Sequence, residues 1–85
     1  MYYFYVLRNL SNPDEFYTGS SRDLKRRLAQ HNHGEQAATR GRQWEVIYYE
    51  AYKVERAVRD RKRTIKRNGR MRTYLMGRIK SQFTE

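Results

Sequence analysis

The sequence predicts an α+β fold, in which a small, mainly antiparallel three-stranded sheet is flanked by three helices. Three observations support this fold class. Two short β-prone stretches lie on either side of a turn-forming cluster, a third lies in mid-chain, and the apolar residues of the second half change to helical spacing. With 85 residues the chain can bury one modest core, so we expect a single domain over residues 1–85.

The first two strands are predicted to form a hairpin. Residues 2–7 are aromatic and β-branched, and they stop at the turn-forming residues 9–13. Residues 15–18 are again β-prone and end at Gly19, so the shortest connection brings them back beside the first strand. The tyrosines of the two strands should then be neighbours.

A helix is predicted for residues 22–32. Ser20-Ser21 followed by Asp23 is typical of a helix start, Leu24 and Leu28 lie one helical turn apart, and Gly34 suits the position just after a helix end. This helix places its apolar stripe against the hairpin.

A loop and a third strand follow. Residues 34–43 have neither the helical nor the strand period, so we expect a polar, basic and mobile loop. Trp44 then opens residues 44–52, whose β-branched and aromatic content predicts the third strand of the sheet.

Two helices account for the rest of the chain. The first carries an apolar stripe at 3.6-residue spacing within residues 54–67, formed by Val54, Ala57, Val58 and Ile65. The pair Asn68-Gly69 breaks it, and a second stripe continues to about residue 80, formed by Met71, Tyr74, Leu75 and Ile79. We expect the first of these helices to lie on the sheet with a basic outer face.

The charge distribution predicts a polyanionic partner. The chain has 19 Lys and Arg against 9 Asp and Glu, a net charge of +10, and residues 51–85 alone contribute +9. A solvated surface is the alternative, but the excess is larger than solubility requires, and few carboxylates lie at i±4 to neutralise it. We therefore predict a phosphate-binding face formed by Arg56, Arg59, Lys62, Arg63, Lys66, Arg67, Arg70 and Arg72.

Several other functions are excluded by composition. Cysteine is absent, which removes disulfides, Cys-ligated zinc and thiol nucleophiles, and fits a reducing compartment. No apolar run approaches the ~20 residues of a membrane span, and Arg8 interrupts the opening apolar stretch too early for a signal peptide. We expect a soluble, cytoplasmic protein with nucleic acid, and no membrane, as its partner.

The ordered motifs of the chain resemble the GIY-YIG nuclease module. They are Tyr3-Phe4-Tyr5, then Tyr17-Thr18-Gly19, then a Leu-x-x-Arg helix that runs into Gln30-His31-Asn32. A single Tyr-x-Gly is common, but this ordered set, with Trp before the third strand and an Ile-Lys pair near the end of the next helix, is specific. The chain is similar along nearly its whole length to small free-standing bacterial members, and it is also similar to the N-terminal nuclease module of a bacterial DNA-repair enzyme, the excision-repair nuclease.

The resemblance implies hydrolysis of a DNA phosphodiester with one divalent metal, Mg²⁺ or Mn²⁺. Tyr5 and Tyr17 would position and deprotonate the attacking water, Arg27 would stabilise the pentacovalent phosphate, and His31 lies one helical turn further on the same side. The residues alone leave alternatives open, because the chain has 8 tyrosines, most of which should be ordinary strand residues. His31 could likewise be a surface histidine or a helix cap.

The expected metal position departs from the family pattern. The family carries a glutamate on its second helix, three residues before the aliphatic residue of an aliphatic-Lys pair. Counting back from Ile65-Lys66 places Lys62 there, and the alternative frame from Ala57 places Arg61 there. Neither side chain can bind Mg²⁺.

Two nearby carboxylates are candidate substitutes, and Glu55 is the better of them. It lies on the correct helix face but two turns, about 10 Å, toward the N-terminus, whereas Asp60 points about 160° away from position 62. An ammonium at a metal site repels the cation and could itself contact phosphate, which favours binding without turnover.

Three functions remain open. The first is a working endonuclease with an unconventional metal ligand, which Tyr5, Tyr17, Arg27 and His31 support. The second is a catalytically silent member that binds branched or duplex DNA, which Lys62 supports. The third is a basic module that binds structured RNA or the ribosome, which explains the charge but not the motifs.

Overall fold

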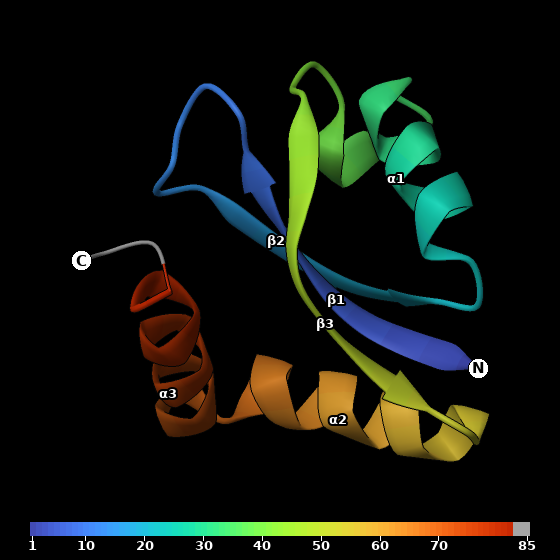
Figure 1. The fold of residues 1–85 in the computed structure, drawn as a ribbon, viewed down its shortest axis with the longest axis vertical. Helices are drawn as coiled ribbons and strands as arrows, with labels where there is room; N and C mark the ends of the chain where they lie inside the picture. Colours follow the sequence, from blue (N-terminus) through green and yellow to red (C-terminus); the bar gives the residue numbers. More distant parts are fainter. Residues whose placement is uncertain (83–85) are drawn as a thin grey trace.

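The computed structural model describes residues 1–82 and has the predicted α+β architecture (Figure 1). The sheet is antiparallel with strand order β2-β1-β3, so the first strand is the central one. The strands are β1 (Tyr2–Asn9), β2 (Phe16–Ser21) and β3 (Trp44–Tyr52). The helices are α1 (Leu24–Asn32), α2 (Glu55–Arg67) and α3 (Gly69–Lys80), with a short 3-10 turn, η1 (Ala37–Thr39), in the loop before β3.

The hairpin of β1 and β2 sets the register of the two motif tyrosines. Tyr5 pairs with Gly19 and Leu7 pairs with Tyr17, so the two tyrosines are diagonal neighbours on one face. Contrary to the predicted end at residue 18, β2 continues through Gly19 to Ser21. The phenol of Tyr5 covers Gly19 so closely that a Cβ there would lie 2.4 Å from the Tyr5 oxygen, and only glycine fits.

The two faces of the sheet carry different helices and separate apolar clusters. On the α1 face, Tyr5 and Leu7 pack with Trp44 and the inner side of α1. On the α2 face, Phe4 and Val6 pack against both C-terminal helices. That second cluster is the larger one, and its helical members are Val58, Ile65, Leu75 and Ile79.

Helix boundaries follow from their caps. Asp23 caps α1 by accepting a hydrogen bond from the Arg26 N–H (3.1 Å), so the helix begins at residue 24 and not at 22. Asn68 ends α2 and also caps α3 by accepting from the Met71 N–H (3.1 Å). Within residues 1–82, no helix is long and apolar enough to cross a membrane.

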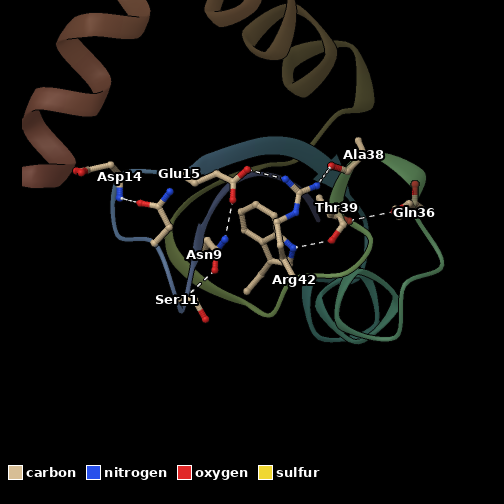
Figure 2. A network of polar contacts seen from close by, with 10 residues as sticks. Asn9, Ser11, Asp14, Glu15, Gln36, Ala38, Thr39 and Arg42 are labelled. Carbon is tan, nitrogen blue, oxygen red and sulfur yellow. Dashed lines mark hydrogen bonds and ion pairs between the residues drawn. The ribbon is translucent and has the colours of Figure 1, made fainter.

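The segment predicted as a loose loop, residues 34–43, is instead held at several points. Figure 2 shows Arg42 donating to the Glu15 carboxylate (2.6 Å), which also accepts from the amide of Asn9 (2.6 Å). The Arg42 guanidinium stacks over the Trp44 ring at 5.3 Å, and Thr39 is fully buried. The loop is as predicted apart from η1, and the sequence did not indicate these contacts because they join distant parts of the chain and leave no periodic signal.

Candidate active site

The centre of the candidate site is a buried row of three polar side chains from three different elements. The Tyr5 hydroxyl lies 2.8 Å from His31 Nε2, and His31 Nδ1 lies 2.7 Å from the Thr39 hydroxyl. The exposed fractions of the three residues are 2%, 1% and 0%. The structure therefore excludes the alternative in which His31 is a surface histidine, and the helix C-cap is the neighbouring His33.

Both titratable members of the row are held in their neutral forms. Burial lowers the pKa of His31, and the positive charge of Arg27 lowers it further. Burial raises the pKa of Tyr5 to about 12, although the charge and hydrogen bonding of Arg27 act in the opposite direction. At neutral pH the site therefore contains a protonated phenol beside an uncharged imidazole.

Tyr17 lies against the same histidine but is half-buried. Its ring meets the His31 ring edge-on at a centroid distance of 5.3 Å and lies 6.4 Å from the Trp44 ring. The two motif tyrosines thus flank His31, as the hairpin register requires. Tyr5 lies deeper, and Tyr17 is the one nearer to solvent.

Arg27 adds a cation to this neutral row. It projects from α1, is half-buried, and borders a surface hollow of about 350 Å³ together with Ser21, Asp23 and Gln30. Its charge affects the pKa values of Tyr5, His31 and Lys62, which places the guanidinium within electrostatic reach of all three. All four residues that the family motif indicated, Tyr5, Tyr17, Arg27 and His31, are therefore brought together.

The position expected to bind a metal carries a half-buried ammonium. Burial lowers the pKa of Lys62, and the charges of Lys66 and Arg27 lower it further, so Arg27 lies within electrostatic reach of Lys62. Residues 1–82 contain no group of three His, Asp or Glu side chains that could hold a metal ion. The side chains at this position do not fit a divalent cation.

The two substitute carboxylates do not change this result. Glu55 is exposed in the first turn of α2 and pairs with Arg59 (2.6 Å). Asp60 is exposed and lies 3.5 Å from Arg63. Each is engaged on the outer surface of the helix, where it partly neutralises the basic face.

Arg61, the alternative occupant of the metal position, has a different role. It donates two hydrogen bonds to Glu50 of β3, at 2.9 and 3.0 Å, and the same carboxylate accepts from Tyr48 and Tyr52 (2.5 Å each). Burial acts to raise the pKa of Glu50, but the bonds from Arg61 and the two tyrosines outweigh it, and the pKa is lowered. The sequence reasoning missed this cluster, although Tyr-x-Glu-x-Tyr places all three strand side chains on one face.

The predicted basic residues gather on the outer side of α2 and the start of α3. All except the half-buried Lys62 are exposed. A shallow hollow of about 280 Å³ on α2 is bordered only by cationic residues, namely Arg59, Lys62, Arg63, Lys66 and Arg67. This surface can hold phosphate groups without specifying a base sequence.

Comparison with known proteins gives a family. Residues 1–74 match the model of the GIY-YIG catalytic domain, which spans all three strands, the first two helices and the start of α3. Searches of curated proteins and of solved structures gave no match. GIY-YIG catalytic domains are nuclease-type domains with nucleic acid as substrate, and they generally depend on a metal. Because the match covers most of the length of the chain, the chain belongs to the GIY-YIG family.

Proposed function

We propose that this protein is a GIY-YIG-type endonuclease domain that binds DNA and in which hydrolysis is impaired because Lys62 occupies the metal position. One observation carries the proposal: Tyr5, Tyr17 and His31 lie in mutual contact beside Arg27. This mutual geometry, formed by residues from two strands and a helix, supports a common site of action.

The proposed proton path uses the neutral pair. A Tyr5 with a pKa of about 12 is a weak base by itself, but its hydroxyl can pass its proton to neutral His31 across 2.8 Å as it takes one from a water molecule. The water oxygen then bonds to phosphorus, the bond from phosphorus to the leaving oxygen breaks, and that oxygen takes a proton from solvent. Tyr17, nearer the surface, would position the water.

Arg27 and Lys62 supply the positive charge in this proposal. A guanidinium can donate two parallel hydrogen bonds to phosphate oxygens, and its charge offsets the charge that develops on them during attack. Lys62 adds a second cation, from α2. Two fixed cations favour phosphate binding, but an ammonium cannot activate a leaving oxygen as a bound metal does.

A catalytically silent DNA-binding module is the second candidate, and Lys62 is the observation that favours it. Repulsion between a divalent cation and the half-buried ammonium disfavours metal binding, whereas the basic face of α2 and α3 is unaffected. Under this alternative the protein would hold branched or duplex DNA without cutting it.

Cleavage of labelled single-stranded, duplex and branched DNA, with structured RNA as a fourth substrate, distinguishes these candidates. Slow cleavage with Mg²⁺ or Mn²⁺ that disappears in Tyr17→Phe and in Arg27→Ala would support the endonuclease. Tight DNA binding with no cleavage would support the silent module. Preference for structured RNA over every DNA substrate would contradict both.

A further inference from the structure

Thr39 is a buried residue at the end of η1 that none of the family motifs described above includes. Its side chain is fully buried, and its hydroxyl lies 2.7 Å from His31 Nδ1, on the side of the ring opposite Tyr5. We propose that Thr39 is a positioning residue that holds His31 in the tautomer with hydrogen on Nδ1, so that bare Nε2 is free to take the Tyr5 proton. This inference rests on the proposed function of the Tyr5–His31 pair.

The hydrogen bonds of Thr39 are compatible with a His31 ring that carries its hydrogen on Nδ1. The Thr39 hydroxyl has a single hydrogen to donate, and it donates to the backbone carbonyl of Gln36 at 3.4 Å, as Figure 2 shows. When Nδ1 carries the hydrogen, it donates to the Thr39 oxygen at 2.7 Å, and the hydroxyl hydrogen keeps the Gln36 carbonyl as its acceptor.

The pattern on the Tyr5 side agrees. Arg27 can only donate, so the Tyr5 oxygen acts as an acceptor toward it. The Tyr5 hydrogen still needs an acceptor, since the residue is only 2% exposed, and His31 Nε2 at 2.8 Å provides one. The buried Tyr5 hydroxyl thus requires a bare Nε2, which leaves the hydrogen of the neutral ring on Nδ1, where the Thr39 oxygen accepts it.

Trp44 fixes Thr39 in this position. The indole N–H of Trp44 donates to the Thr39 carbonyl at 3.0 Å, and the backbone of Trp44 is bound on both sides by the amide of Asn32, at 2.7 and 3.1 Å. Threonine is also stiff at χ1 because it is β-branched. The hydroxyl therefore cannot easily turn away from the ring, and the histidine keeps one tautomer.

The tautomer decides whether the pair can act. With hydrogen on Nε2, His31 would face Tyr5 as a donor and could not accept its proton. Residues that orient metal-bound histidines through a hydrogen bond contribute about 10- to 100-fold in activity or metal affinity. We expect the cleavage rate to fall by a factor in that range when the Thr39 hydroxyl is removed. The two short contacts of the ring and the burial of both hydroxyls support the same assignment.

Nitrogen-15 NMR of the His31 ring tests the proposal in the free protein, without metal or DNA. The proposal predicts a protonated Nδ1 and a bare Nε2 in the wild type and in Thr39→Ser, which keeps the hydroxyl. Thr39→Val keeps the shape and loses the hydroxyl, so hydrogen should move to Nε2 in a large share of molecules. Wild-type protein with hydrogen on Nε2, or Thr39→Val with an unchanged tautomer, would overturn it.

The NMR measurement of the His31 tautomer does not depend on cleavage, so it tests the role of Thr39 separately from the proposed function. The expected tautomers with no cleavage of any substrate would uphold the role of Thr39 in orienting His31 and would contradict only the endonuclease. If Thr39→Val fails to fold, as judged by circular dichroism and Trp44 fluorescence, the wild-type and Thr39→Ser tautomers still decide. In a cleaving background, Thr39→Ser should retain the rate and a folded Thr39→Val should lose about 10- to 100-fold. Equal rates in the two would also contradict the proposal.

Discussion

Each face of the sheet carries a polar cluster that includes tyrosine hydroxyls, buried on the α1 face and half-buried on the α2 face, and the hydroxyls have different partners. On the α1 face the Tyr5 hydroxyl is hydrogen-bonded to an uncharged imidazole. On the α2 face Tyr48 and Tyr52 donate to Glu50, a carboxylate already paired with Arg61. An imidazole can accept a proton near neutral pH, whereas a carboxylate with a lowered pKa holds none. One cluster can therefore move a proton, and the other can only hold its elements together.

The cluster around Glu50 nevertheless affects the candidate site. Glu50 and Arg61 join β3 to α2, and Lys62 is the next residue along that helix. The ion pair therefore holds α2, and with it Lys62, against β3. A contact on the α2 face thus bears on the position of a residue that lies within electrostatic reach of Arg27.

The largest effect is expected from Arg27→Ala, measured in the Lys62→Glu background. Loss of the guanidinium should lower the cleavage rate by about 10²- to 10³-fold, the range found when one preorganised donor to a developing oxyanion is removed. The matched control is Arg26→Ala, one residue earlier and exposed. A similar loss in both variants would show that Arg27 acts through general charge and not through contact with phosphate.

The next largest effect is expected on stability, from Glu50→Ala. It leaves Arg61 and two tyrosine hydroxyls without their acceptor, so the free energy of unfolding should fall by about 2–3 kcal/mol, less than for a fully buried pair. Urea denaturation measures this, with Glu55→Ala as the control because its ion pair is exposed. Equal losses in the two variants would remove the structural role that we assign to Glu50.

A smaller effect is expected on DNA affinity from charge reversal on the α2–α3 surface. The combined substitutions Lys66→Glu, Arg67→Glu and Arg70→Glu should weaken binding evenly across DNA sequences and flatten its dependence on salt, by about one unit of slope per lost phosphate contact. The control reverses three exposed cations elsewhere, Lys25, Arg40 and Lys53. If the control weakens binding as much, the basic face is not the binding surface.

The smallest effect is a pH dependence of stability that depends on His31. Because folding lowers its pKa below the ordinary value of 6.5, the unfolded chain binds the proton more strongly, and stability falls as pH drops through about 6.5 toward the lower folded value. His31→Gln should lose this part of the pH dependence, and His33→Gln, with an exposed side chain, is the control. Urea denaturation between pH 8 and pH 5 measures it. The same slope in wild type and His31→Gln would contradict a buried, neutral His31.

Local patterns predicted much of this molecule. Strand content, the Asp23 cap and the i, i+4 relation of Arg27 and His31 all depend on neighbours in sequence, and the structure has each of them. The family motif indicated which tyrosines face His31, which composition alone could not do.

The remaining features depend on contacts between distant segments. Gly19 lies within β2 and not at its end, because the Tyr5 phenol fills the space above it. Thr39 lies in a segment without periodicity, and Glu50 finds Arg61 on another element. The spacing of residues in the sequence cannot predict such contacts, because they depend on how the helices and strands pack together.

The central claim is that an otherwise complete site is impaired at one position, and Lys62→Glu tests it most directly. Cleavage of the DNA panel with Mg²⁺ or Mn²⁺ should be slow in the wild type, should rise in Lys62→Glu, and should not rise in Lys62→Gln, which removes the charge without adding a metal ligand. Vigorous cleavage by the wild type, unchanged in Lys62→Glu, would contradict the account and place the metal elsewhere.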